Sequence, residues 1–242
     1  MPKQVLTDQQ IIVGGYDLTS STNAVALDYA AEGKDCTTYG DDTRVLMGGL
    51  KTVQLQAGGF FDAVPQDSPL FSNVGASDVP ISIMAQGTTD GDVGFFFRSM
   101  AGQYSLSADV GELFKYSLAA GASQGPLVRG QLLNDSTETA SGDGAAIQVG
   151  AASSTQTVYA VLHVTASSGS GDQTLDVTIG SDDNGSFTSE TNRFTFTQAT
   201  TSVTSEFLSL VGPITDDYWR INFAIAGTGS PSFDIKVLLG VM

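Results

Sequence analysis

The sequence is poor in cysteine, histidine and basic side chains, and each shortage excludes a class of function. Its 242 residues include one cysteine, Cys36, and one histidine, His163. Neither an internal disulfide nor a metal site rich in Cys or His can therefore form. Ten Lys and Arg stand against 26 Asp and Glu, for a net charge of −16. A protein that grips nucleic acid by its phosphates needs the opposite balance.

Long apolar runs are also missing. No stretch approaches the roughly 20 residues of a membrane helix, and the first ten residues, MPKQVLTDQQ, lack the pattern of a secretion signal. No glycine-rich loop is suited to hold a phosphate, because Gly33-Lys34 lacks both the upstream Gly and the following Ser or Thr. We expect a protein that folds in a cytoplasm, without a membrane partner and without a cofactor.

Glycine, by contrast, is abundant, and apolar residues alternate with polar ones. The 28 Gly exceed the typical share of about 7%. Alternation with a period of two is typical of half-buried strands. In the last hundred residues it runs through 158–164, 175–179, 194–196, 219–225 and 233–241. These segments predict an antiparallel β-sandwich of jelly-roll type.

The chain is organised around residues 40–62, GDDTRVLMGGLKTVQLQAGGFFD. An acidic turn leads through an Arg and two Gly into a strand pattern that ends on two aromatics. Within that strand Leu50, Thr52, Gln54 and Gln56 share one face, and Lys51, Val53, Leu55 and Ala57 share the other. The alternation predicts a strand with one buried face.

This stretch resembles the tail-tube (major tail) proteins of long-tailed bacteriophages and phage-derived particles. In that family an acidic turn leads through Arg to a Gly-Leu-Lys step and a strand that ends on Gly-Phe-Phe-Asp. The upstream segments at 17–18 and 23–27 fit the opening of the same pattern. The residues that carry the resemblance, and that we expect to form an assembly motif, are Gly40, Asp41, Arg44, Gly49, Leu50, Lys51, Phe60 and Phe61.

The resemblance implies a virion structural protein that is not an enzyme. Copies would form stacked rings around a continuous inner β-barrel, and the tube would conduct DNA without binding it tightly. Implied partners are the chain itself, the tape-measure and terminator proteins of the tail, and the passing viral DNA. The implied location is the virion tail, after assembly in the host cytoplasm.

Four segments describe the expected domain organisation. Residues 1–10 form an N-terminal arm, and 11–133 form a tail-tube-like β-sandwich or barrel domain. Residues 134–144, almost free of apolar side chains, form a linker or long loop. Residues 145–242 form the second sandwich, either as an outward domain or as a second tube-like domain. That choice leaves three or six chains per ring open.

Some short segments are less regular. We expect a turn at 32–35, with a return strand from 36 to 39, and a loop from 64 to 79. Residues 109–120 carry apolar residues at a helical spacing as well, but the family resemblance favours a strand around 114–118, which we expect.

Few residues suggest chemistry. Ser123 lies in a G-x-S-x-G pattern, but Pro126 and Gly130 follow where a nucleophile elbow needs a helix. His163 is expected on a strand face that is partly exposed or lies in an interface. Asp182, Asn184 and Ser186 match the start of a calcium loop that lacks its closing acid. We expect no catalytic and no metal-binding residues. Alternatives to the tube subunit are a capsid decoration or other tail protein and a glycan-binding β-sandwich.

Overall fold

Extended strands dominate the computed structural model, which describes residues 9–62 and 67–242. This confirms the prediction of a mainly β protein. Within the described ranges one α-helix is present, α1 (Asp67–Ser72). The strands are β1 (Gln10–Val13), β2 (Tyr16–Asp17), β3 (Thr22–Asp35), β4 (Leu46–Phe60), β5 (Val79–Met84), β6 (Val93–Ser107), β7 (Lys115–Glu138), β8 (Gly142–Asp143), β9 (Ile147–Gln148), β10 (Thr157–Ser168), β11 (Thr174–Asp182), β12 (Thr191–Thr195), β13 (Thr204–Val211), β14 (Tyr218–Ala226) and β15 (Ser232–Val241).

The chain divides into two compact units that are not continuous in sequence. The sandwich unit comprises Met1–Ser20, Val79–Phe97 and Val128–Met242, and the hairpin unit comprises Ser21–Asp78 and Arg98–Leu127. These units differ from the expected domains at 11–133 and 145–242, because β6 and β7 each begin in one unit and end in the other.

The expected arm and linker also differ from what is observed. Most of the arm, residues 1–10, lies outside the described residues, and Gln10 already begins β1. Within the expected linker, residues 134–138 complete β7 and two residues form β8. Asn134 is buried there and donates from Nδ2 to the Ile235 carbonyl at 3.0 Å. Polar composition alone could not reveal that these side chains are satisfied inside a sheet.

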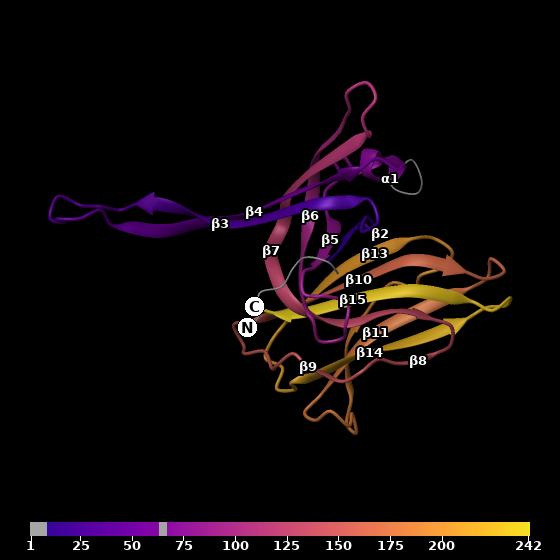
Figure 1. Ribbon diagram of the computed structural model, residues 1–242. Coiled ribbons are helices and arrows are strands. Elements are labelled where there is room, and N and C mark those ends of the chain that lie inside the picture. Colours follow the sequence, from indigo (N-terminus) through magenta and orange to yellow (C-terminus); the bar gives the residue numbers. More distant parts are fainter. Residues whose placement is uncertain (1–8, 63–66) are drawn as a thin grey trace. The chain divides into compact units, whose positions relative to one another are not determined.

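Two sheets build the sandwich unit (Figure 1). In the larger one, β10 lies between β13 and β15 and is antiparallel to both, and β15 then pairs with β7. The path continues through β6, β5, β1 and β2. The smaller sheet has the order β12-β11-β14-β8, with β9 also paired to β14.

The predicted alternation locates the core of this unit. Alternate residues are buried over 158–164 of β10, 175–179 of β11, 219–223 of β14 and 233–239 of β15, and these side chains form one apolar cluster. Burial of that alternating face supplies the driving force that holds sheet against sheet. The members from these four strands are Val158, Ala160, Leu162, Val164, Leu175, Val177, Ile179, Trp219, Ile221, Phe223, Phe233, Ile235, Val237 and Leu239.

The hairpin unit contains a sheet with the order β3-β4-β7-β6. Val53, Leu55 and Ala57 of β4 are buried, which confirms the predicted inner face. On β7, Tyr116 and Leu118 are buried as well. The expected strand around 114–118 is therefore present, beginning at Lys115, and the helical spacing at 109–120 was coincidental.

Two short expectations were wrong. Residues 32–35 continue β3 rather than turning, because the pairing with β4 runs on to Asp35 and Leu46. The turn therefore falls at 36–45. Part of the expected loop at 64–79 is helix α1, whose Leu70 is buried. Nowhere in the described chain is a helix long and apolar enough to span a membrane.

Candidate assembly surface

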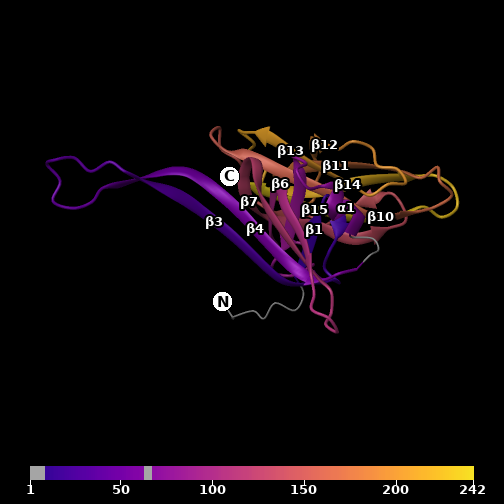
Figure 2. The ribbon, with the colours of Figure 1, turned by 90° about the horizontal axis from the view of Figure 1, so that it is seen from above.

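The β3–β4 hairpin extends well beyond the segment in which β4 pairs with β7. The two strands pair from Thr22 and Gly59 to Asp35 and Leu46. β4 pairs with β7 only over 54–60. Residues 29–35 of β3 and 46–53 of β4 therefore have only each other as sheet neighbours in the described chain. Figures 1 and 2 show this distal half continuing past β7 as a two-stranded ribbon.

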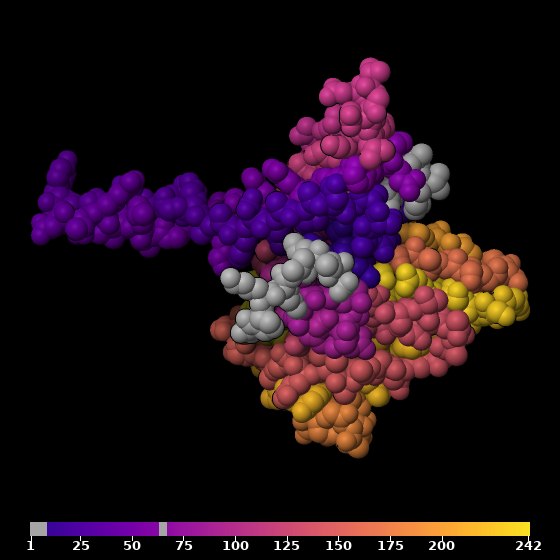
Figure 3. Space-filling model, in the orientation of Figure 1, coloured from indigo at the N-terminus to yellow at the C-terminus, as the bar shows by residue number. Residues whose placement is uncertain are grey.

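Large apolar side chains on this distal half are exposed. Leu50 is 80% exposed, Met47 63% and Leu46 57%. The register of β3 and β4 shifts between Ala31 and Gly33, so regular alternation of side chains is interrupted on β4 between Gly48 and Lys51. Figure 3 shows how narrow this ribbon is. Exposed apolar residues gathered in this way are typical of a surface that contacts another protein.

The tip is held by a short polar network. Asp35 Oδ2 accepts a hydrogen bond from Arg44 Nε at 2.9 Å, and Asp35 Oδ1 accepts from the Thr37 amide at 3.0 Å. Asp41 Oδ2 accepts from the Thr38 amide at 2.7 Å. Hydrogen bonds from Thr37, and then from Arg44, lower the pKa of Asp35, and those from Thr38 lower the pKa of Asp41. The turn is thus ordered by its own side chains.

The assembly motif from the sequence is distributed along this hairpin. Gly40, Asp41 and Arg44 lie in the tip, and Gly49, Leu50 and Lys51 lie in distal β4.

Two of these distal residues have identifiable contacts. A Cβ at Gly49 would lie 3.1 Å from the Glu32 carbonyl, so glycine allows a close approach of the strands there. Lys51 Nζ lies 5.6 Å from the centre of the Tyr29 ring, a cation–π contact.

The aromatic end of the motif lies at the base of the hairpin. Phe60 closes β4 and is 41% exposed. The Phe61 ring packs against the Phe114 ring in a tilted arrangement, with centroids 4.9 Å apart and 54° between the ring planes. The motif therefore marks two ends of one hairpin rather than a single pocket.

An open strand edge accompanies the apolar ribbon. Within the described residues, β3 is paired with β4 and with no other strand. Its 14 residues present backbone N–H and C=O groups along the other side. Such an edge invites pairing with a further strand. The sequence predicted neither this edge nor the exposure of Leu46 and Met47, because both depend on where β7 ends its pairing.

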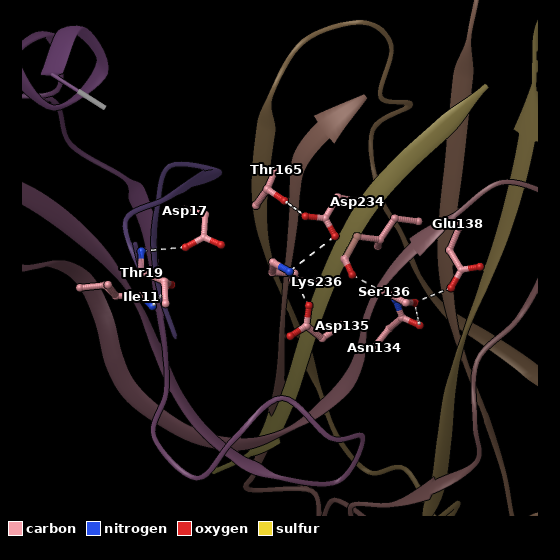
Figure 4. A network of polar contacts seen from close by, with 11 residues as sticks. Ile11, Asp17, Thr19, Asn134, Asp135, Ser136, Glu138, Thr165, Asp234 and Lys236 are labelled. Atoms are coloured by element: carbon pink, nitrogen blue, oxygen red, sulfur yellow. Dashed lines mark hydrogen bonds and ion pairs between the residues drawn. The ribbon is translucent and has the colours of Figure 1, made fainter. Parts of the chain in front are cut away.

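A second group of polar residues, in the sandwich unit, is closed to solvent. His163, Lys236 and Asp135 are in register on β10, β15 and β7, so they form a row across the sheet. Lys236 forms an ion pair with Asp135 and lies 3.5 Å from Asp234 Oδ1 (Figure 4). Burial lowers the pKa of Lys236, but Asp135 and then Asp234 and Asp17 outweigh burial and raise it above the ordinary value. This row is a structural network.

His163 was expected on a partly exposed or interface face, but it is fully buried within the sandwich unit. A hydrogen bond of 2.7 Å joins its Nε2 to Ser82 Oγ. Burial, with a smaller effect of Lys236, lowers its pKa to about 3. The strand pattern showed which face His163 occupies, but not that β5 supplies Ser82 to cover that face.

The remaining candidates for chemistry do not form reactive sites. Ser123 lies inside strand β7 rather than at a strand-to-helix elbow, and its Oγ donates to Asp78 Oδ1 at 3.3 Å. Asp182 accepts hydrogen bonds from the Asn184 and Ser189 amides of its own loop. Trp219 is fully buried and its Nε1 donates to the Gly150 carbonyl at 3.0 Å, so it offers no face for stacking on a sugar.

Comparison with known proteins finds likenesses among solved structures only. No protein-family model matches the sequence, and no curated protein matches it. A chain from the virion of a native gene transfer agent particle matches at 18% identity and a TM-score of 0.42, over 52% of this chain and 97% of that one.

Two proteins of phage SPP1 are also matched. Its Dit protein, described as a hub of the adsorption apparatus in phages that infect Gram-positive hosts, matches at 14% identity and a TM-score of 0.38, over 97% of this chain and 99% of that one. Its tail tube matches at 8% identity and a TM-score of 0.41, over 50% of this chain and 76% of that one.

The matched structures are tail or particle proteins, the kind of protein that the sequence resembles. The TM-scores of these three structures lie below 0.5, so the likenesses carry no argument about the function of this chain.

Proposed function

We propose that this chain is a structural protein of a phage or phage-like tail, and within it the subunit of the tail tube. The observation that carries the proposal is the β3–β4 hairpin, with its open strand edge and its exposed apolar ribbon. An isolated two-stranded ribbon is marginal in water, and an exposed apolar edge favours aggregation unless a partner covers it. Identical copies supply such a partner.

Ring closure follows from the arrangement of the sheet in the hairpin unit. β3 lies at an edge of this sheet, and beyond β7 the path continues through β6 to β5, β1 and the terminal strand β2. Pairing of β3 in one copy with the edge strand of the next is a head-to-tail contact, which closes when the rotation per copy divides a full turn. A closed barrel leaves no free edge. In this proposal residues 40–62 form the assembly motif, and the rings stack into a conduit for DNA.

The charge of the chain supports a conduit rather than a DNA-binding role. The chain has a net charge of −16. In the proposed tube an acidic wall repels phosphate and lets DNA pass. The implied partners remain the tape-measure and terminator proteins, and the location the virion tail. The proposed tube domain, residues 11–133, includes the whole hairpin unit and part of the sandwich unit, and residues 145–242 are the proposed second sandwich. A ring with six tube domains then contains six chains, or three if each chain supplies two.

The proposal is tested by removing apolar side chains from the ribbon. Leu46→Ser with Leu50→Ser should leave the melting temperature unchanged, since both side chains are exposed, and should abolish sedimentation as rings or tubes. The matched control is Val211→Ser with Met242→Ser, which removes two exposed apolar side chains outside the hairpin. Equal assembly of both variants would contradict the role of the hairpin. A capsid decoration protein would instead bind preformed capsids and form no tube.

A further inference from the structure

The ion pair between Lys236 and Asp135 holds an amine against a carboxylate in a place that water hardly reaches. The two residues lie opposite each other on β15 and β7, 101 positions apart in sequence. Lys236 Nζ donates a hydrogen bond to Asp135 Oδ1, and each side chain is 6% exposed. A nucleophile and an acyl carbon are therefore in contact and shielded from solvent.

A second carboxylate contacts the same amine. Asp234 Oδ1 lies 3.5 Å from Lys236 Nζ, and Asp234 Oδ2 accepts a hydrogen bond from Thr165 Oγ1. Figure 4 shows Asp135 and Asp234 both joined to the Lys236 ammonium. His163 lies opposite Lys236 on β10 and, with its pKa lowered to about 3 by burial, is uncharged at neutral pH. The amine thus has one carboxylate to react with and another to exchange protons with.

We propose that Lys236 and Asp135 condense to an intramolecular isopeptide bond, with Asp234 as the residue that transfers protons. One Nζ proton passes to Asp135 Oδ1 along the existing hydrogen bond, and Nζ then adds to Asp135 Cγ. Asp234 takes a second proton from Nζ and returns it to the departing oxygen. The Nζ–Cγ bond forms, one Cγ–O bond breaks and one water leaves, so no oxidant or further reactant is consumed.

The fold favours this condensation in two ways. The strand register makes the reaction intramolecular, and well-oriented groups reach effective molarities of about 10⁵–10⁸ M. The product also replaces two buried charges, which are costly to remove from water, with a neutral amide. The pair of Lys34 with Glu32 contains the same functional groups, but its side chains are 61% and 52% exposed. It lacks the second advantage and serves as a control within the same chain.

The test is the intact mass of the folded full-length chain after overnight incubation, followed by peptide mapping. We expect the loss of one water and a cross-linked peptide pair that contains Lys236 and Asp135, with no cross-link at Lys34. Lys236→Arg keeps a positive charge but presents a guanidinium that stays protonated, so it should retain the full mass. Asp234→Asn should slow the loss of water at least about a hundredfold, since it removes the proton acceptor.

Three results would contradict the proposal. Full mass in all the folded wild type after incubation would overturn it, and this outcome does not depend on how well the variants fold. A loss of water that maps to Asp90 or Asp143, each followed by glycine, would indicate a succinimide instead. Equally fast cross-linking in Asp234→Asn would remove Asp234 from the reaction. All three are independent of the tail-tube role, because the reacting residues belong to the sandwich unit alone.

Discussion

At the scale of single residues, the buried ion pair between Lys236 and Asp135 makes the clearest prediction. Both side chains are 6% exposed. Asp135→Asn leaves the ammonium without its main partner, and breaking a buried pair costs about 3–5 kcal/mol. Urea denaturation should show this loss. Asp35→Asn is the control, because its pair with Arg44 is exposed and screened by solvent, so its loss should change stability little. Equal losses would show that Lys236 finds other partners.

His163 predicts a dependence of stability on pH. Its pKa is about 3 when folded, whereas an unfolded histidine titrates near 6.5. Above pH 6.5 both states are neutral and its contribution is complete. As the pH falls from 6.5 toward 3, the unfolded state binds a proton that the folded state does not bind. The free energy of unfolding therefore falls by about 1.4 kcal/mol per pH unit.

The measurement is the free energy of unfolding of wild type and His163→Gln between pH 7 and 4. The difference between the two curves should change steadily with pH. A difference that stays constant over that range would mean that His163 does not titrate on unfolding in this way.

At the scale of elements, two glycines of β4 test the geometry of the hairpin. A Cβ at Gly59 would lie 1.9 Å from the Ser21 carbonyl, whereas one at Gly48 would meet nothing within 4 Å. Gly59→Ala should therefore cost about 1–3 kcal/mol, as overpacking does. Gly48→Ala should be neutral or slightly stabilising. Thermal melts of the two variants compare them directly, and similar melting temperatures would argue against the pairing of Thr22 with Gly59.

The strands themselves were predictable from the sequence. Burial of Val53, Leu55 and Ala57, or of Phe233 and Ile235, follows from a period of two, which is a local property. The turn at 32–35 was misplaced because composition cannot report how far a pairing register continues. Helix α1 was missed because it is shorter than two turns and contains Pro69, so its periodicity is too brief to detect.

The candidate surfaces were predictable only in part. The motif of residues 40–62 drew attention to the hairpin, and its residues do lie along it. The open edge of β3 and the burial of His163 depend on contacts between residues far apart in sequence.

At the scale of the whole molecule, the account rests on two properties, an acidic chain and a hairpin whose outer strand, β3, has an open edge. The net negative charge keeps the chain from binding phosphates, so we expect the protein not to bind double-stranded DNA at physiological salt. A gel-shift titration checks this, with a salt series to detect any contribution from phosphate contacts. Tight, salt-dependent binding would contradict a passive conduit.

Self-assembly is the central claim, and electron microscopy of the purified full-length chain, with sedimentation over a range of concentrations, tests it most directly. We predict closed rings with a central channel, which stack into tubes as the concentration rises. A compact monomer at every concentration, with no ring in any image, would contradict the claim.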